Sequence, residues 1–328
     1  MKFLCVFIIA LGVSAEICRT VALEGGGSHG AYEAGALWTL VNMLDPAEVA
    51  YDMISGISTG ALNTGAMVQF PQGQEKPMAD FLVNTWLTIG GRENVFKDWP
   101  GGITQGLLFM RGIYDTSPLV NMMKEKLTNG IQRKFSIGTT NFDTGLFETF
   151  DESVGNDGLI EAIMCSASPP FVFPYRVVNG VTYADGGCLI NLDVFSAVNR
   201  CYEMTKDYSE IVVDLLFDYN ITNVPKETSF KTLDVISRVS EIKGYNSGIW
   251  YYNEAARAYP DVKFRYVVIP SSKLPGGIIP LNFNQTVIEE SVQMGKVDAA
   301  RVIMEGQNGR DTIKKAYEEM RSKVIIPN

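Results

Sequence analysis

A serine between two glycines, in the pentapeptide Gly56-Ile57-Ser58-Thr59-Gly60, is the residue of this chain best suited to nucleophilic chemistry. The apolar residues Met53 and Ile54 precede it, and a small-residue segment able to begin a helix follows. A strand, a tight turn and a helix form a nucleophile elbow, in which the two glycines prevent collisions with strand and helix. The pattern therefore predicts that Ser58 is a nucleophile, with an ordinary surface serine in a small-residue turn as the alternative.

A glycine-rich loop, Gly25-Gly26-Gly27-Ser28-His29-Gly30, lies between a short β-type run and a segment with helical spacing from Ala31 to Leu44. Backbone N–H groups converge at such a loop, and the helix dipole favours negative charge there. Gly25, Gly27 and Gly30, with Asp52 about 20 residues on, match a dinucleotide-binding fingerprint. The same geometry would form an oxyanion hole for acyl transfer. We favour the oxyanion hole, because a dinucleotide-binding protein has no use for a GxSxG turn on the next strand.

The base that would activate Ser58 is not an obvious histidine. The chain has one histidine, His29, which lies inside the glycine loop, whereas the catalytic histidine of α/β-hydrolases follows the serine. Asp185, in Asp185-Gly186-Gly187, follows a strand or hairpin predicted from Val177 to Tyr183. The two glycines allow this aspartate to approach another loop closely, so Asp185 is the candidate base. Taken alone, the segment is more typical of a turn.

The elements around these residues alternate between strand and helix, which favours one α/β domain. The 328 residues, 46% of them hydrophobic and 20% charged, are typical of a globular protein. In a helix predicted from Met78 to Leu87, the apolar residues Phe81, Leu82, Trp86 and Leu87 share one face, which favours core packing over a lipid groove. Further strands are predicted at 211–217 and 263–270, long helices at 230–258 and 286–304, and a loop at 271–283 that is either a lid or an ordinary connection.

The first fifteen residues resemble a secretory signal peptide, with Lys2 before an apolar stretch and small residues ahead of a cleavage site after Ala15. We therefore expect a protein that is secreted or resides in the lumen of the secretory or endolysosomal route. Four cysteines then remain, and they permit three disulfide pairings, among which the sequence does not choose: Cys18, Cys165, Cys188 and Cys201.

The formal net charge is −9, and the sequence contains no basic run. Nucleic acid is therefore not expected as a partner. Electrostatics also do not favour anionic membranes, so a lipid surface would be neutral or zwitterionic, or would be held by apolar contacts.

Together, GGGSHG at 25–30, GISTG at 56–60 and DGG at 185–187 resemble the signature of the patatin-like phospholipase family. The resemblance extends to IYDTSPL at 113–119, TTNFDTG at 139–145 and CSASPPFVFP at 165–174, and covers the chain from about Val21 to Asn191. It implies a three-layer α/β/α fold with a nucleophile elbow, here a single domain over residues 16–328.

The resemblance also implies a Ser-Asp dyad, with Ser58 as nucleophile and Asp185 as general base. It places the oxyanion hole at Gly25, Gly26, Gly27 and Ser28, with Gly30, Gly56, Gly60, Gly186 and Gly187 supporting the motifs. The expected activity is hydrolysis of carboxylic esters in phospholipids or other acyl lipids at a transient membrane or micelle surface, without metal or organic cofactor.

One departure from the family pattern is His29, because many members carry Arg or Lys there. Two other classes stay open: a lipid-binding or storage protein that has kept the fold with little turnover, and, more distantly, a dinucleotide-binding oxidoreductase.

Overall fold

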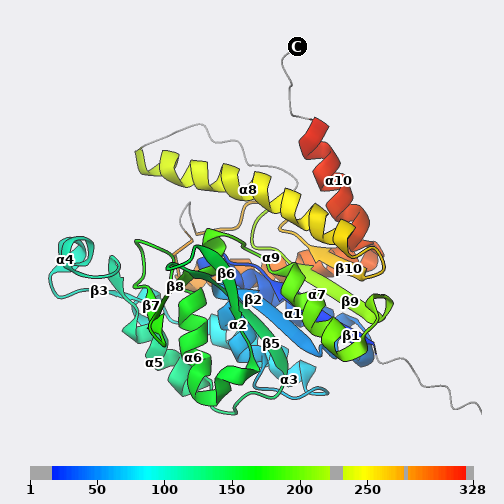
Figure 1. The fold of residues 1–328 in the computed structure, drawn as a ribbon, viewed down its shortest axis with the longest axis horizontal. Helices are drawn as coiled ribbons and strands as arrows, with labels where there is room; N and C mark the ends of the chain where they lie inside the picture. The colour runs from blue at the N-terminus through cyan, green and yellow to red at the C-terminus, as the bar shows by residue number, and fades with distance from the viewer. Residues whose placement is uncertain (1–16, 222–231, 277–279, 323–328) are drawn as a thin grey trace, which may run out of the picture.

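A central eight-stranded sheet organises the molecule, here a computed structural model that describes residues 17–221, 232–276 and 280–322 (Figure 1). The predicted signal peptide lies outside the described residues. The strand order is β10-β9-β1-β2-β5-β8-β7, with β6 paired to β5. The five strands from β10 to β5 run parallel, whereas β6 and β8 are antiparallel to β5. The strands are β1 (Cys18–Leu23), β2 (Met53–Ile57), β5 (Lys134–Asn141), β6 (Leu146–Phe150), β7 (Arg176–Val178), β8 (Val181–Asp185), β9 (Ile211–Leu216) and β10 (Lys263–Val268).

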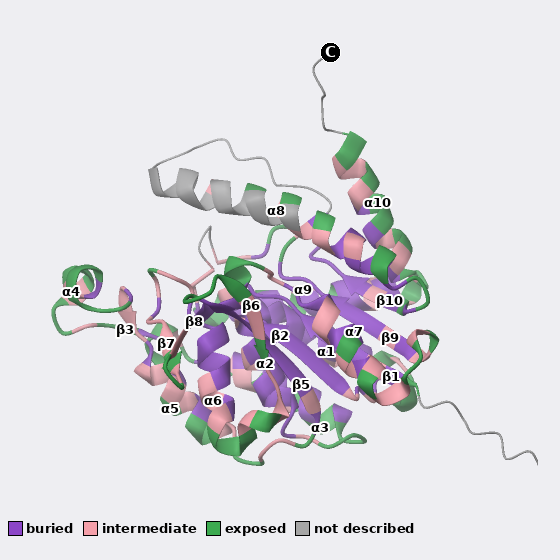
Figure 2. Ribbon diagram, in the orientation of Figure 1, coloured by how far each residue is buried: buried purple, intermediate pink, exposed green. Residues whose placement is uncertain are grey.

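Helices cover both faces of this sheet, and the central strands are buried between them (Figure 2). One hydrophobic core lies between the sheet and α1 (Gly30–Met43), α2 (Thr59–Met67), α3 (Glu75–Leu87), α5 (Ser117–Lys126), α6 (Gly155–Ser166) and α9 (Gln285–Met304). The second core lies between the sheet and α7 (Val194–Thr205), α8 (Thr232–Ala258) and α10 (Gly309–Ser322). The predicted three-layer α/β/α class is therefore confirmed.

The predicted elements are present, with boundaries that differ by a few residues. The helix expected from Met78 begins earlier, at Glu75, and the segment before Asp185 is a hairpin of β7 and β8. The helix expected from residue 230 is α8, of which residues 232–258 are described. Strands β9 and β10, which lie beyond the last sequence motif, belong to the same sheet as β1 and β2.

A smaller element projects from this body. Helix α4 (Gly102–Phe109) lies at the left of Figure 1, between the two short strands β3 (Lys97–Asp98) and β4 (Tyr114–Asp115), which pair antiparallel. None of the described helices is long and apolar enough to cross a membrane.

A disulfide joins Cys18 on β1 to Cys201 on α7. Cys165 and Cys188 are free thiols, the first buried and the second exposed. The structure thus forms one of the possible disulfides and leaves the other two cysteines as free thiols. This disulfide fixes the first strand of the sheet to a helix of the second core.

The register of the parallel strands brings the sequence motifs together at one edge. Leu23, the last residue of β1, pairs with Gly56 near the end of β2, so the glycine loop and the Ser58 turn leave the sheet side by side. On the other side of β2, Thr139 of β5 pairs with Asp185 at the end of β8. A candidate site therefore forms where β1, β2 and β8 end.

Candidate active site

Ser58 occupies a strained turn between β2 and α2. Its backbone has φ 55° and ψ −115°, a left-handed conformation that costs energy for any residue except glycine. The Ser58 N–H donates to Ser166 Oγ at 2.8 Å, and the Ser166 hydroxyl donates to the carbonyl of Gly138 at 2.6 Å. The surrounding structure thus holds the strained turn in place.

The two glycines of the pentapeptide are needed for close packing. A Cβ on Gly56 would overlap the carbonyl of Gly60, and a Cβ on Gly60 would overlap the carbonyl of Leu23. Helix α2 therefore begins directly against the end of the sheet, with the Ser58 side chain at its N-terminus. This is the geometry of a nucleophile elbow.

The Asp185 carboxylate is buried and accepts a hydrogen bond from the Ser58 side chain. It also accepts the N–H of Gly187 at 2.8 Å. The backbone of Asp185 is held by Ser168, whose carbonyl accepts its N–H, and by Thr140, whose hydroxyl donates to its carbonyl at 2.9 Å. The serine and the aspartate that the sequence singled out are therefore in direct contact, although 127 positions separate 58 from 185.

Burial sets the basicity of this carboxylate. It raises the pKa of Asp185 from an ordinary 3.8 to about 6, while the hydrogen bonds from Ser58 and from the Gly187 N–H hold the pKa below what burial alone would produce. A carboxylate with a raised pKa binds a proton more readily, which suits a general base. His29, in contrast, is buried, and burial lowers its pKa to about 4, so its imidazole is neutral near pH 7.

The glycine loop lies against the nucleophile. A Cβ built on Gly25 would lie 3.0 Å from Ser58 Cβ, so a side chain larger than hydrogen does not fit there. The Gly25 N–H donates to the Asn191 carbonyl at 3.0 Å, and the Ser28 N–H donates to the Pro280 carbonyl at 2.8 Å. Within residues 17–221, 232–276 and 280–322, the N–H groups of Gly26 and Gly27 have no acceptor. Of the four expected oxyanion donors, these two are the ones that the fold leaves available.

Asn191 is a part of the site that the sequence did not reveal. Its side-chain amide donates to the Gly25 carbonyl at 2.8 Å, while its own carbonyl accepts the Gly25 N–H. Its Oδ1 also lies so close to Gly25 and Gly187 that a Cβ on either glycine would be 2.6 Å away. Asn191 therefore links the glycine loop to the loop that carries Asp185.

Three buried carboxyl groups lie beneath the glycine loop: Glu24, Glu33 and Asp218. Burial raises the pKa of Glu24 to about 7, and it raises the pKa of Glu33 and of Asp218 well above their ordinary values. Glu24 accepts the N–H of Asp218 at 2.7 Å, and Glu33 accepts the N–H of Glu24 at 2.6 Å. The Asp218 carboxyl oxygens have no hydrogen-bond partner among the described residues, and a Cβ on Gly26 would collide with them.

A broad, open cavity lies in front of the nucleophile, and its volume of about 1130 Å³ includes space open to solvent. Its floor is polar, with Ser58, Asp185 and the glycine loop, and its walls are mostly apolar. Pro280, Leu281 and Phe283 contribute part of the lining, so the loop predicted at 271–283 borders the site. Residues 277–279 of this loop lie outside the described residues. The remaining lining residues include Leu62, Val95, Leu119, Pro169, Pro170, Val172 and Phe173.

The position of Asp52 contradicts the dinucleotide interpretation. Asp52 directly precedes β2, at the opposite end of that strand from Ser58, and its carboxylate accepts the N–H of Arg19 at 2.8 Å. The glycine loop follows the other end of the neighbouring β1. Asp52 thus lies at the sheet edge away from the loop, where it cannot contact a ribose bound there.

The patatin-like phospholipase model matches residues 21–198, more than half of the 328 residues. A search for similar curated proteins finds no match. Among the solved structures that match, that of VipD from Legionella pneumophila shares 13% sequence identity, with a TM-score of 0.41. The match covers 89% of this chain and 67% of VipD.

Proposed function

Because the chain belongs to the patatin-like phospholipase family, a family of lipid acyl hydrolases, we propose that it cleaves carboxylic esters of phospholipids or related acyl lipids through a Ser58–Asp185 dyad. The observation that carries this proposal is the hydrogen bond from the Ser58 side chain to the buried Asp185 carboxylate, on the floor of an apolar-walled cavity. A reacting ester would lie between this pair and the unpaired N–H groups of Gly26 and Gly27.

The proposed reaction proceeds in two steps. Ser58 Oγ attacks the ester carbonyl carbon while Asp185 takes the hydroxyl proton, and the carbonyl oxygen becomes an oxyanion that accepts the N–H groups of Gly26 and Gly27. The intermediate collapses to an acyl-enzyme, and the alcohol leaves with the proton from Asp185. Water, deprotonated by Asp185, then attacks the acyl-enzyme, and the fatty acid leaves as Ser58 regains its proton.

The backbone N–H donors of the glycine loop stabilise the oxyanion and so compensate for the weak basicity of the Asp185 carboxylate. Even with its pKa raised to about 6, Asp185 is a far weaker base than an alkoxide. An oxyanion donor typically contributes about 3 to 4 kcal/mol to transition-state stabilisation. The loop reaches this arrangement at little cost during the reaction, because Asn191 and Pro280 already fix its backbone on either side of the two free N–H groups.

The partner is a transient lipid surface, and α4 supports this part of the proposal. Ile103, Leu107, Leu108 and Phe109 are exposed on α4, with Phe109 at 79%, and the helix carries no charged residue. The segment after α4 is bound to the cavity rim, since Ile113 and Tyr114 donate their N–H groups to the carbonyls of residues 171 and 172. Grouped exposed apolar side chains of this kind mark interaction surfaces, and their neutrality favours zwitterionic or neutral lipid.

Secretion, or residence in the lumen of the secretory or endolysosomal route, is part of the same proposal. The signal-like N-terminus suggests it, and the disulfide between Cys18 and Cys201 supports it, because disulfides form and persist in oxidising compartments. Expression with the native N-terminus tests it: the proposal requires protein in the medium or in a lumenal fraction that begins at Glu16, and retention in the cytosol with an intact N-terminus would contradict it.

The test of the activity is fatty-acid release from phosphatidylcholine vesicles by the mature protein in the presence of EDTA. We expect release by the wild type and near-complete loss in Ser58→Ala and in Asp185→Asn. The exposed Asp157→Asn on α6 is the matched control for the second substitution and should retain activity. Equal release by wild type and Ser58→Ala would refute the dyad. A wild type that is inert on vesicles and on soluble esters would favour lipid binding or storage instead.

A further inference from the structure

Two sequons for N-glycosylation occur in the chain, NIT at 220–222 and NQT at 284–286. The first follows β9, and the second spans the start of α9. An N-glycan is bulky and polar, so a folded protein accommodates one only where the asparagine side chain faces solvent with room around it. The two sequons differ in how their asparagine is held.

The sequon at 284–286 is exposed over its whole length. Asn284, Gln285 and Thr286 are each exposed. Asn284 is the N-cap of α9, with φ −63° and ψ 143°, and within the described part of the chain its side chain makes no capping hydrogen bond. An asparagine at an N-cap ordinarily uses its side chain to cap the helix. The Asn284 amide is therefore available for modification without the loss of a native hydrogen bond.

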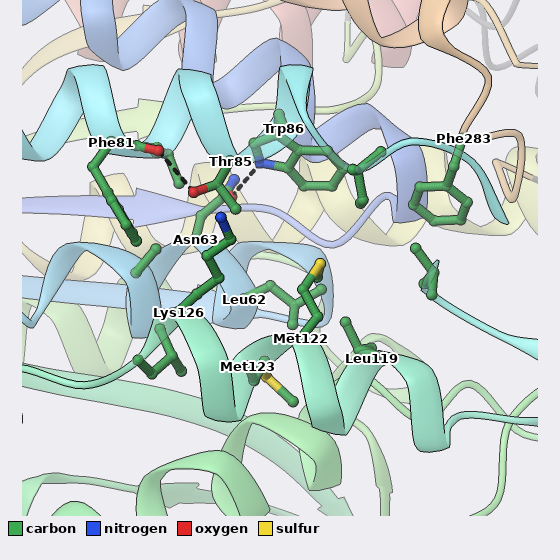
Figure 3. Close-up of a pocket in the computed structure, with 15 residues that line it drawn as sticks. Leu62, Asn63, Phe81, Thr85, Trp86, Leu119, Met122, Met123, Lys126 and Phe283 are labelled. Atoms are coloured by element: carbon green, nitrogen blue, oxygen red, sulfur yellow. Dashed lines mark hydrogen bonds between the residues drawn. The ribbon is translucent and has the colours of Figure 1, made fainter. Parts of the chain in front are cut away.

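The preceding residue determines the direction of this side chain. Phe283 is 5% exposed and lines an apolar pocket together with Trp86 of α3, with the two rings nearly parallel and their centroids 6.5 Å apart (Figure 3). Trp86 belongs to the hydrophobic core, as predicted for this face of α3. Successive side chains of an extended chain point to opposite sides, so a buried Phe283 directs Asn284 toward solvent. The Asn284 N–H donates to Asn282 Oδ1 at 3.1 Å, which fixes the backbone at the start of the helix.

Asn220 is held in a different way. It is half-buried, and its side-chain amide donates to the Pro270 carbonyl at 3.1 Å. Ile221, the middle residue of this sequon, is 4% exposed and belongs to the second core. Thr222 lies outside the described residues. A sugar on Asn220 would replace a hydrogen of an amide that is already engaged, next to a residue that is packed in the core.

We propose that Asn284 is the acceptor of an N-linked glycan and that Asn220 is not. The inference goes beyond the proposed hydrolysis, and its occurrence in the cell rests on the proposed passage through a secretory lumen. The donor is an oligosaccharide linked to a lipid pyrophosphate. A bond forms between Asn284 Nδ2 and the anomeric carbon of the first sugar, and the bond from that carbon to the pyrophosphate oxygen breaks. The lipid pyrophosphate leaves with the bonding electrons, and the amide gives one proton to the transferase.

This modification is compatible with the proposed reaction. Phe283 lines the cavity in front of Ser58, and Asn284 directly follows it on the solvent side. The glycan would therefore be attached at the edge of the site, without occupying the Ser58–Asp185 pair or the N–H groups of the glycine loop.

Expression in a eukaryotic host behind a heterologous signal peptide tests the acceptor independently of the native N-terminus. We expect the protein recovered from the medium to lose the mass of one N-glycan on treatment with peptide-N-glycosidase F. That enzyme leaves an aspartate where a glycan was attached, and peptide mapping should find this change at position 284 and not at position 220. Secreted protein with no glycan at Asn284, or with a glycan at Asn220, would overturn the proposal.

Gln285→Pro is the sharpest variant for this test. It keeps Asn284 and Thr286 but should abolish the glycan, because a proline in the middle position destroys a sequon. Gln285 is the first residue of α9, a position at which helices tolerate proline well. Gln285→Ala is the matched control and should keep the glycan, as should Asn220→Gln. A glycan that persists in Gln285→Pro, or one that is lost in Asn220→Gln, would overturn the assignment.

Expression with the native N-terminus separates this proposal from that of secretion. A glycan on Asn284 behind the heterologous signal, with the native chain intact and unmodified in the cytosol, would contradict secretion and leave the acceptor assignment standing. A native chain that is secreted without a glycan would overturn the acceptor assignment and leave secretion standing.

Discussion

Replacing Asp185 by asparagine should abolish activity and, at neutral pH, relieve a cost in stability. Asp185 is 6% exposed, and burial raises the pKa of its carboxylate to about 6. Because the pKa is raised in the folded state, the folded protein binds this proton more tightly than the unfolded chain does. The free energy of unfolding therefore falls as pH rises from about 4 to about 6. Asparagine has nearly the same shape and does not titrate, so it removes this fall.

The size of the effect follows from the pKa. A rise from 3.8 to about 6 corresponds to about 3 kcal/mol, since each pKa unit is worth about 1.4 kcal/mol. Asparagine also changes the hydrogen bonds with Ser58 and Gly187, and that cost does not depend on pH. Comparing two pH values cancels the constant part. Between about pH 3.5 and about pH 7.5, the wild type should lose about 3 kcal/mol more stability than Asp185→Asn does.

Urea unfolding at both pH values measures this difference, with Asp157→Asn as the exposed control that should follow the wild type. Ser58→Ala should change the pH dependence of stability in the direction opposite to Asp185→Asn. It removes a hydrogen bond that lowers the pKa of Asp185, so the pKa should rise further and the pH-dependent loss should grow. Carboxyl carbon NMR of Asp185 follows the pKa directly. A pKa near 3.8, with no difference in pH dependence between wild type and Asp185→Asn, would refute the assignment of a buried base.

Three further outcomes follow from the site and its supports. Activity should rise with pH through about 6 as Asp185 ionises, and it should fall above about 7 as Glu24 ionises. Glu24→Gln should move the falling limb of the kcat/KM profile to higher pH. An unchanged falling limb would exclude Glu24 as its source. Replacing Leu107 and Phe109 together by serine should weaken binding to phosphatidylcholine vesicles at least about tenfold, measured by sedimentation against hydrolysis of a soluble ester as reference, and wild-type binding would contradict a docking role for α4. Cys201→Ser should lower the urea-derived free energy of unfolding by about 2 to 5 kcal/mol, and a loss well below that would mean that the bond to Cys18 contributes little.

The parts of the site that the sequence predicts are those that local chemistry determines. The Ser58 turn requires glycines at fixed positions, and the glycine loop joins a strand to a helix within a few residues. Such patterns are visible without knowledge of the fold. Identifying Asp185 as the base required the combination of three motifs, because an Asp-Gly-Gly segment alone is more typical of an ordinary turn.

The parts that the sequence did not reveal are contacts between distant segments. Ser166, which holds the Ser58 N–H, is 108 positions away from it, and Asn191, which holds the Gly25 carbonyl, is 166 positions away. Neither residue stands in a pattern that indicates its partner. The pairing of Cys18 with Cys201 is of the same kind, because it depends on which helix packs against β1.

The neutral acids beneath the glycine loop explain how the proposed reaction can proceed without a fixed positive charge at position 29. His29 is uncharged near pH 7, because burial lowers its pKa to about 4, so it adds no cation beside the oxyanion. An ionised carboxylate at Asp218, directly under Gly26, would oppose the oxyanion at short range, yet burial and the nearby Glu33 and Glu24 keep the pKa of Asp218 high. The loop then presents its N–H dipoles over protonated, uncharged groups, as carboxylic acids held neutral by apolar surroundings do in other active sites. In the proposed reaction, oxyanion stabilisation therefore depends on the backbone of Gly26 and Gly27, and on a pH low enough to keep the acids beneath them protonated.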